Sequence, residues 1–246
     1  MELLTLTIVA LTLMIVFTLE VIAPASKNHC DRRWMILSGV ITAFQSVFTI
    51  GSGIVFAQTF KAISLFHFNN FHMFIQGVLG FLLTSFVAYW WHRAMHKFDV
   101  LWRVFHQLHH SPSRIESLTS FYLHPFDGIA ATLLNALCCY LVLGVNAYGA
   151  AVSLIIAAVY NIYIHSDLKT PFWIGFILQR PEMHRVHHKR MHHSQNYGLA
   201  IWDGMFGTFL NPKEYIQEVG FDQQREHRIY DMLKMKDVYK TKMKTK

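Results

Sequence analysis

The stretch "GIAATLLNALCCYLVLGVNAYGAAVSLIIAAVYNIYIH" (residues 128–165) contains no Asp, Glu, Lys or Arg. The 37 residues before His165 would form about 55 Å of α-helix, nearly twice the ~30 Å thickness of bilayer hydrocarbon. The segment "LGVNAYG" at 143–149 offers glycines and an asparagine for a turn in the middle. The sequence therefore predicts two antiparallel membrane helices that return the chain to the side on which it started.

Other long uncharged runs cover residues 3–19, 34–60 and 73–91. Each is near or above the ~18–20 residues that cross a membrane as a helix. Charged residues make up 15% of the chain, against roughly 25% in soluble domains. We predict an all-α integral membrane bundle of four to five spans, three of them near 3–23, 35–58 and 73–91. The first is expected to be a retained span, because no basic residues precede it and no A-x-A cleavage site follows closely.

The net charge of +7 lies mostly outside these spans and in the tail "KMKDVYKTKMKTK" (234–246). Attraction to anionic headgroups explains basic residues that flank apolar segments more simply than nucleic-acid binding does. The division predicted from these patterns is N-terminal membrane spans over 1–72, a catalytic region over 73–210 and a basic cytoplasmic tail over 211–246.

The positive-inside rule orients the predicted bundle. The first loop carries three basic residues, Lys27, Arg32 and Arg33, whereas the loop 59–72 carries only Lys61. The first loop and the histidine-rich stretches after the third and fifth spans are therefore expected on the cytoplasmic side, where they would form a helical cap.

Histidines recur at helical spacing in four short elements: "HRAMH" (92–96), "HQLHH" (106–110), "NIYIH" (161–165) and "HRVHH" (184–188). Residues three and four apart share one face of an α-helix, whereas residues three apart face opposite ways on a strand. The spacing predicts helical turns, each of which projects two or three polar side chains toward one point.

A group of eight or nine imidazoles is too large for one metal ion and suits two. Imidazole binds iron, zinc, copper and nickel. The His-Glu-x-x-His pattern of zinc proteases is absent, and a b-type haem needs only two histidines. Two other classes stay open: a divalent-metal transporter or sensor, and a proton-sensing membrane protein. The lack of charged residues in 34–60 and 128–164 argues against a transport pathway.

These four elements, with "PEMHRVHH" and "NYGLAIWDGMFGTF", resemble the fatty acid hydroxylase/sterol desaturase superfamily of membrane di-iron oxygenases over roughly residues 75–210. The resemblance implies that nine histidines bind iron: His92, His96, His106, His109, His110, His165, His184, His187 and His188. Asn161 stands where some hydroxylases of the family have a histidine, and is included as a candidate ligand.

Several further residues receive lesser roles. We expect His124, in "HPFD", to support the site indirectly or to begin a helix, and His192 and His193 to lie outside it. Acidic side chains often orient metal-binding histidines, and the nearest candidates along the sequence are Asp167, Glu182 and Asp203. The basic residues beside the motifs, among them Arg185, are expected to contact headgroups.

The resemblance implies an O₂-dependent enzyme with two Fe ions that hydroxylates or desaturates a lipid. Because the chain shows no dinucleotide fingerprint and no cysteine-based iron–sulfur motif, a separate electron donor is expected, of cytochrome b5 or ferredoxin type. The strings "PEMHRVHH" and "NYGLAIWDGMFGTF" are closest in form to bacterial members of the family, which favours a bacterial inner membrane over the endoplasmic reticulum. The sequence distinguishes neither the lipid nor hydroxylation from desaturation.

Overall fold

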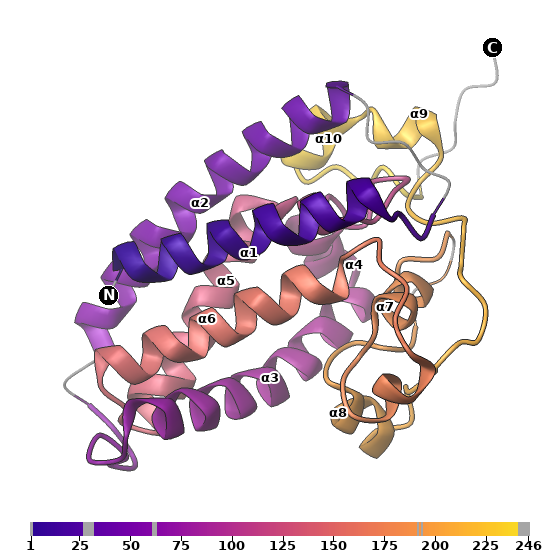
Figure 1. The fold of residues 1–246 in the computed structure, drawn as a ribbon. Helices are drawn as coiled ribbons and strands as arrows, with labels where there is room; N and C mark the ends of the chain where they lie inside the picture. Colours follow the sequence, from indigo (N-terminus) through magenta and orange to yellow (C-terminus); the bar gives the residue numbers. More distant parts are fainter. Residues whose placement is uncertain (1, 27–31, 61–62, 191, 193, 241–246) are drawn as a thin grey trace.

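The fold is a bundle of long helices with short helices gathered at one end (Figure 1). The computed structural model describes residues 2–26, 32–60, 63–190, 192 and 194–240. Within these ranges every regular element is helical, apart from one isolated antiparallel bridge between Lys189 and Val219. The prediction of an all-α protein is confirmed.

Five apolar stretches among the described residues are long enough to cross a membrane. They are α1 (Glu2–Ile22), α2 (Arg32–Phe60), α3 (Met73–Lys97), α5 (Pro125–Ala136) with its π-helical continuation η3 (Leu137–Val142), and α6 (Ala147–Ile164). Large apolar side chains on their outer faces are exposed, such as Ile22 at 73% and Val47 at 69%. An exposed apolar surface of this extent is what a lipid-facing bundle presents, and the five candidate spans agree with the predicted four to five.

The turn predicted in the middle of the longest uncharged run is confirmed. Gly144 has a φ of +61°, and a Cβ there would lie 2.1 Å from the carbonyl oxygen of Phe66, so only glycine fits. Asn146 then caps α6, because its side chain accepts a hydrogen bond from the Gly149 N–H at 3.0 Å. The helices α5 and α6 therefore run in opposite directions.

Three spans are longer than the uncharged runs that predicted them. The helix α1 continues past the run 3–19, through Glu20, to Ile22. The helix α3 continues six residues past Trp91 to Lys97, and α2 already begins at Arg32. Charged and histidine side chains are adequate helix formers, so a change in polarity marks the membrane boundary and not the helix boundary. This extension places His92 and His96 on the last turns of a spanning helix.

The cap is built from short helices at the end of the bundle where α3 and α6 finish and α2 and α5 begin (Figure 1). They are α4 (Asp99–Leu101), the π-helical η1 (Trp102–His106), η2 (Ser117–Phe121), η4 (Phe172–Phe176), α7 (Pro181–His187), α8 (Ala200–Met205), α9 (Gln223–Glu226) and α10 (Ile229–Leu233).

Hydrogen bonds from buried polar side chains hold the segments of the cap together. The Glu20 carboxylate, near the end of α1, accepts hydrogen bonds from the backbone N–H groups of Ser117 at 2.8 Å and Asp167 at 2.6 Å. Arg185 is fully buried and donates to the carbonyl oxygens of Ile216 at 2.8 Å and Ile115 at 3.2 Å. The expectation that Arg185 contacts headgroups was wrong, because α7 lies inside the cap.

Candidate metal centre

Nine histidines converge in two neighbouring groups at the capped end of the bundle. The five-histidine cluster consists of His92, His96, His106, His110 and His187, and the four-histidine cluster of His109, His165, His184 and His188. Within each cluster one nitrogen from every ring lies within 4.8 Å of the others. The rings of His110 and His188 stack across the boundary with centroids 4.1 Å apart, so the two clusters are adjacent.

Each of the four sequence elements contributes to this convergence. His92 and His96 come from the end of α3, and His165 caps the end of α6. The elements 106–110 and 184–188 each supply rings to both clusters. The helical spacing therefore brings together residues that are up to 96 positions apart, counted from His92 to His188.

The element "HQLHH" differs in form from the predicted α-helix. The Gln107 N–H donates to the carbonyl of Trp102, five residues back, at 2.8 Å, which closes a π-helical turn at His106. One α-type bond follows, from the His110 N–H to the His106 carbonyl at 3.2 Å, while His109 sits in the turn. His106 and His110 belong to one cluster and His109 to the other, the same division that His184, His188 and His187 show at the end of α7, and π turns are frequent at functional sites.

The Nε2 atoms of the five-histidine cluster face one another at short range. The pairs are His92–His106 at 2.8 Å, and His106–His110, His110–His187 and His187–His96 at 3.1 Å each. In the four-histidine cluster the pairs are His109–His165 at 3.1 Å, His165–His184 at 2.9 Å and His184–His188 at 3.1 Å. Two nitrogens that bind one ion at right angles, each at about 2.1 Å, would be about 3.0 Å apart.

The tautomers of two rings show why a cation fits here. The Nδ1 of His92 lies 2.7 Å from the carbonyl oxygen of Tyr197, and the Nδ1 of His106 lies 3.4 Å from a carboxylate oxygen of Asp127. Both partners accept hydrogen bonds, so in the neutral rings the protons are on Nδ1 and the Nε2 atoms carry lone pairs. Two lone pairs 2.8 Å apart repel each other, and a metal ion between them removes the conflict.

A loop after the last motif orients two rings of the five-histidine cluster. The carbonyl of Gln195 accepts from the Nδ1 of His187 at 2.9 Å, as the carbonyl of Tyr197 does from His92. Between them, Asn196 adopts a φ of +51°, a left-handed conformation that asparagine tolerates better than most residues. The two carbonyls therefore point at the cluster from either side of one tight turn.

Asn196 and Asp203 hold this loop in place. The fully buried Asn196 amide donates to the carbonyls of Met183 at 2.8 Å and Leu210 at 2.9 Å, and its oxygen accepts from the Leu210 N–H at 2.9 Å. The Asp203 carboxylate accepts from the N–H groups of Tyr197 at 2.8 Å and Gly198 at 3.1 Å. Burial raises the pKa of Asp203 to about 6, and these hydrogen bonds oppose the rise.

Asn161 supports the four-histidine cluster through its backbone. Its carbonyl accepts from the Nδ1 of His165 at 2.8 Å, while its side-chain amide donates to the Ser120 carbonyl at 2.8 Å. The amide is therefore engaged with the protein backbone, and Asn161 positions a ring of the cluster.

Burial keeps these imidazoles neutral. Loss of hydration, reinforced by the neighbouring rings, holds the pKa of His109, His110, His184 and His188 well below the usual value. Burial likewise lowers the pKa of His165 to about 4, against the opposing effect of its bond to Asn161. Neutral rings are the form that binds a metal.

A pH dependence of stability follows for the metal-free chain. These histidines take up protons near pH 6.5 when unfolded, but only at much lower pH when folded, so below pH 6.5 the unfolded state binds more protons. The free energy of unfolding should therefore be highest above pH 6.5 and fall by several kcal/mol, as an order of magnitude, toward about pH 4. Thermal unfolding of the metal-free protein in detergent, measured from pH 8 to about pH 4.5, checks this. A midpoint unchanged over that range would contradict the burial of neutral rings.

The remaining sequence predictions have mixed outcomes. His124 begins α5, where its Nδ1 accepts from the Phe126 N–H at 3.2 Å, so the helix-entry role is confirmed. His192 lies outside both clusters, and His193 lies outside the described residues. The candidate carboxylates Asp167 and Glu182 bind Ser26 and Thr170 respectively rather than a clustered ring.

The acidic side chain that does face a ring, Asp127, was missed. It lies three residues after His124 in "HPFD", and this string is the feature of the sequence from which Asp127 could have been predicted. The carbonyls of Gln195 and Tyr197 were missed as well, although the string "NYG" marks the turn that presents them.

Comparison with known proteins adds independent evidence. A model of the family described as fatty acid hydroxylase matches residues 77–208, a segment that includes all nine clustered histidines. An ornithine lipid hydroxylase of Rhizobium tropici is 34% identical over 147 residues, covering 57% of this chain and 43% of that protein.

Two eukaryotic relatives match a similar share of the chain. An alkylglycerol monooxygenase of Xenopus tropicalis is 32% identical over 146 residues, covering 56% of this chain and 31% of that protein. A putative Delta(7)-sterol-C5(6)-desaturase 2 of Arabidopsis thaliana is 28% identical over 154 residues, covering 61% and 53% respectively. The matched part spans about half or less of the length of these relatives. No solved structure matches the chain.

Proposed function

This chain belongs to the fatty acid hydroxylase family, and on that premise we propose that it is an O₂-dependent di-iron oxidoreductase that hydroxylates or desaturates an unactivated C–H position of a membrane lipid. The observation that carries the proposal is the convergence of nine imidazoles on two adjacent centres at one end of an apolar helical bundle. In this proposal residues 73–210 form the catalytic region, 1–72 the N-terminal spans and 211–246 a basic cytoplasmic segment.

The five-histidine cluster would hold one iron ion and the four-histidine cluster the other. Imidazole nitrogen is a suitable ligand for iron, and the ligand sets are complete without Asn161, whose proposed role is to orient His165. Two iron ions bound there would supply the reductive activation of O₂ that attack on an unactivated C–H bond requires.

The protein would orient the metal-binding rings and exclude water from them. The carbonyls of Gln195 and Tyr197 hold the protons of His187 and His92 on Nδ1, which leaves Nε2 free to bind metal. The Tyr197 ring also lies against the five-histidine cluster, with centroid distances of 5.3 Å to His187, 5.4 Å to His92 and 5.5 Å to His96. This ring would screen the cluster from bulk water.

The position of α8 supports a lipid substrate. The indole N–H of Trp202 donates to the Ser85 hydroxyl at 3.0 Å, and Ser85 lies twelve residues, about 18 Å of helix, before the last residue of α3. The helix α8 thus reaches farther along the span than His92 does, and its exposed Ile201 and Met205 would face hydrocarbon. A lipid could approach the clusters sideways along this surface without crossing the cap.

The names of the relatives suggest the chemical class of the substrate. Each of the three names an acyl or alkyl lipid or a sterol: an ornithine lipid, an alkylglycerol and a sterol. We propose a substrate from one of these lipid classes. It would be acted on at the cytoplasmic face of the membrane, as the distribution of basic residues favours. The resemblance of "PEMHRVHH" and "NYGLAIWDGMFGTF" to bacterial members favours a bacterial inner membrane.

A separate one-electron carrier of cytochrome b5 or ferredoxin type would supply electrons. The buried Trp102 ring lies 5.3 Å from the rings of both His96 and His110, and 5.9 Å from the ring of Tyr239. These aromatic side chains offer a short route toward the outside of the cap, where basic residues suit an acidic carrier.

The test is the lipid composition of cells that express the chain, compared under ¹⁸O₂ with cells that express His187→Ala. A new lipid that carries one added oxygen of mass eighteen supports hydroxylation, and one that lacks two hydrogens supports desaturation. Identical lipid profiles, despite equal amounts of the two proteins and about two irons per chain in the parent, would reject the proposal. Metal flux into liposomes without O₂ consumption would instead support a transporter.

A further inference from the structure

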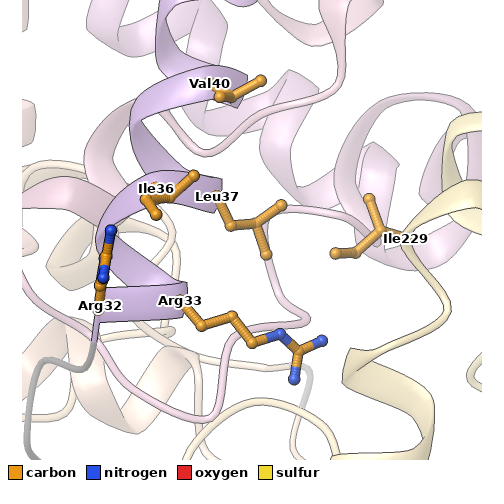
Figure 2. Close-up of a pocket in the computed structure, with 6 residues that line it drawn as sticks. All are labelled: Arg32, Arg33, Ile36, Leu37, Val40 and Ile229. Atoms are coloured by element: carbon orange, nitrogen blue, oxygen red, sulfur yellow. The ribbon is translucent and has the colours of Figure 1, made fainter.

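An apolar groove, with two arginines among the residues that line it, lies on the outside of the bundle between α2 and α10. It has a volume of about 520 Å³ and is lined by Arg32, Arg33, Ile36, Leu37, Val40 and Ile229 (Figure 2). The two arginines occupy the first positions of α2, and the aliphatic side chains follow over the next two turns. Ile36 and Val40 are 57% and 61% exposed, so the apolar part of the groove is open to the surroundings of the bundle.

The groove is separate from the metal centre. No clustered histidine lines it. Its inner wall, Leu37 and Ile229, packs against a buried core that contains Trp102, and Trp102 lies between that core and His96. An occupant of the groove would therefore be separated from the five-histidine cluster by Leu37 and Ile229 and by the core residue Trp102.

The cap end of the groove is cationic. Among the described residues neither Arg32 nor Arg33 pairs with a carboxylate, and Arg33 donates to the Nε2 of His227 at 2.7 Å. A second cavity of about 310 Å³ continues from Arg33 and is lined also by Arg114, Arg190 and one acidic residue, Glu226. Positive charge therefore prevails where the groove meets the cap.

We propose that this groove binds one anionic phospholipid of the adjacent leaflet. The phosphate would lie at Arg32 and Arg33, and an acyl chain would follow Ile36 and Val40 along α2. The span α2 begins at Arg32, so the arginines stand at headgroup level and the aliphatic wall at hydrocarbon level. Two arginines that pair with no carboxylate among the described residues favour an anionic over a zwitterionic headgroup, by about tenfold or more.

The bound lipid would hold the C-terminal segment against the metal centre. The chain after α10 contacts Gln107, whose amide donates to the Lys236 carbonyl at 2.8 Å, and Leu233 accepts from His124 at 3.3 Å. Gln107 follows His106 directly in the sequence. Because Ile229 forms one wall of the groove, a lipid that joins α2 to α10 would link the composition of the membrane to the packing around His106.

The experiment measures how much phosphatidylglycerol stays bound to the iron-loaded full chain. The protein is taken from nanodiscs of phosphatidylcholine and phosphatidylglycerol, and the bound lipid is detected by native mass spectrometry. Arg32→Gln/Arg33→Gln removes the charge, and Ile36→Trp fills the apolar part while keeping both arginines. Lys169→Gln/Lys213→Gln removes two exposed charges elsewhere on the cap, and Val47→Trp enlarges an exposed position of α2 outside the groove.

We expect the parent and both controls to retain one phosphatidylglycerol, and each groove variant to lose it at least about tenfold more readily. Inorganic phosphate at millimolar concentration should not displace it. The proposal would be overturned if either groove variant retained phosphatidylglycerol as the parent does. It would also be overturned if Lys169→Gln/Lys213→Gln lost the lipid as readily as the groove variants, or if inorganic phosphate displaced it. Iron content confirms that each variant is folded, and one folded groove variant suffices for the comparison.

Discussion

Replacing His187 by alanine is expected to empty the five-histidine cluster and to lower the rate of lipid oxidation by roughly a thousandfold or more, as loss of one member of a cooperative catalytic unit does. The His187 Nε2 lies 3.1 Å from the Nε2 atoms of both His96 and His110, so its ring joins two parts of the cluster. The iron content, measured by elemental analysis, should fall from about two to about one per chain, because the four-histidine cluster keeps its ligands.

Two matched variants sharpen this prediction. His192→Ala changes a histidine in the same segment that lies outside both clusters, and it should leave iron content and activity unchanged. His184→Ala should remove the other ion, since its ring belongs only to the four-histidine cluster. If His187→Ala kept two irons and full activity, the assignment of that ligand set would be wrong.

Replacing Asn196 by aspartate is the second change with a large expected effect. The substitution keeps the shape of the side chain but places an oxygen where the amide donates to the carbonyls of Met183 and Leu210. Buried oxygens at that distance repel one another, and the loop should shift. Because this loop orients His92 and His187, the affinity of the five-histidine cluster for iron should fall about 10- to 100-fold.

The control for this variant is Asn146→Asp, the same chemical change at the start of α6. There the side-chain oxygen accepts from the Gly149 N–H, a role that aspartate fills equally well. Iron release into a chelator, followed over time, should be fast for Asn196→Asp and unchanged for Asn146→Asp. Equal release rates for parent and Asn196→Asp would show that the loop does not orient the ligands.

The spans were predictable because the length of an uncharged run follows directly from the thickness of a membrane. The grouping of the histidines was predictable because helical spacing places side chains on one face before any tertiary contact is known. The turn at Gly144 and the cap at Asn146 belong to the same class of local signals.

Other features depend on tertiary contacts that residue types do not reveal. The partners of His92 and His187 are backbone carbonyls, which every residue has, so the string "NYG" marked a turn but not the residues whose carbonyls face the rings. Asp127 comes from the start of α5, whereas the acids considered lay closer to the other histidine motifs. Arg185 was misassigned because a basic side chain next to a membrane is usually exposed, and here it is buried inside the cap.

The most direct test of the two-metal assignment is anomalous X-ray diffraction at the iron absorption edge, on crystals of protein reconstituted with iron under anaerobic conditions. We expect two peaks per chain, one surrounded by His92, His96, His106, His110 and His187, and the other by His109, His165, His184 and His188. A single peak, or peaks away from these rings, would contradict the assignment and the oxidative chemistry that rests on it.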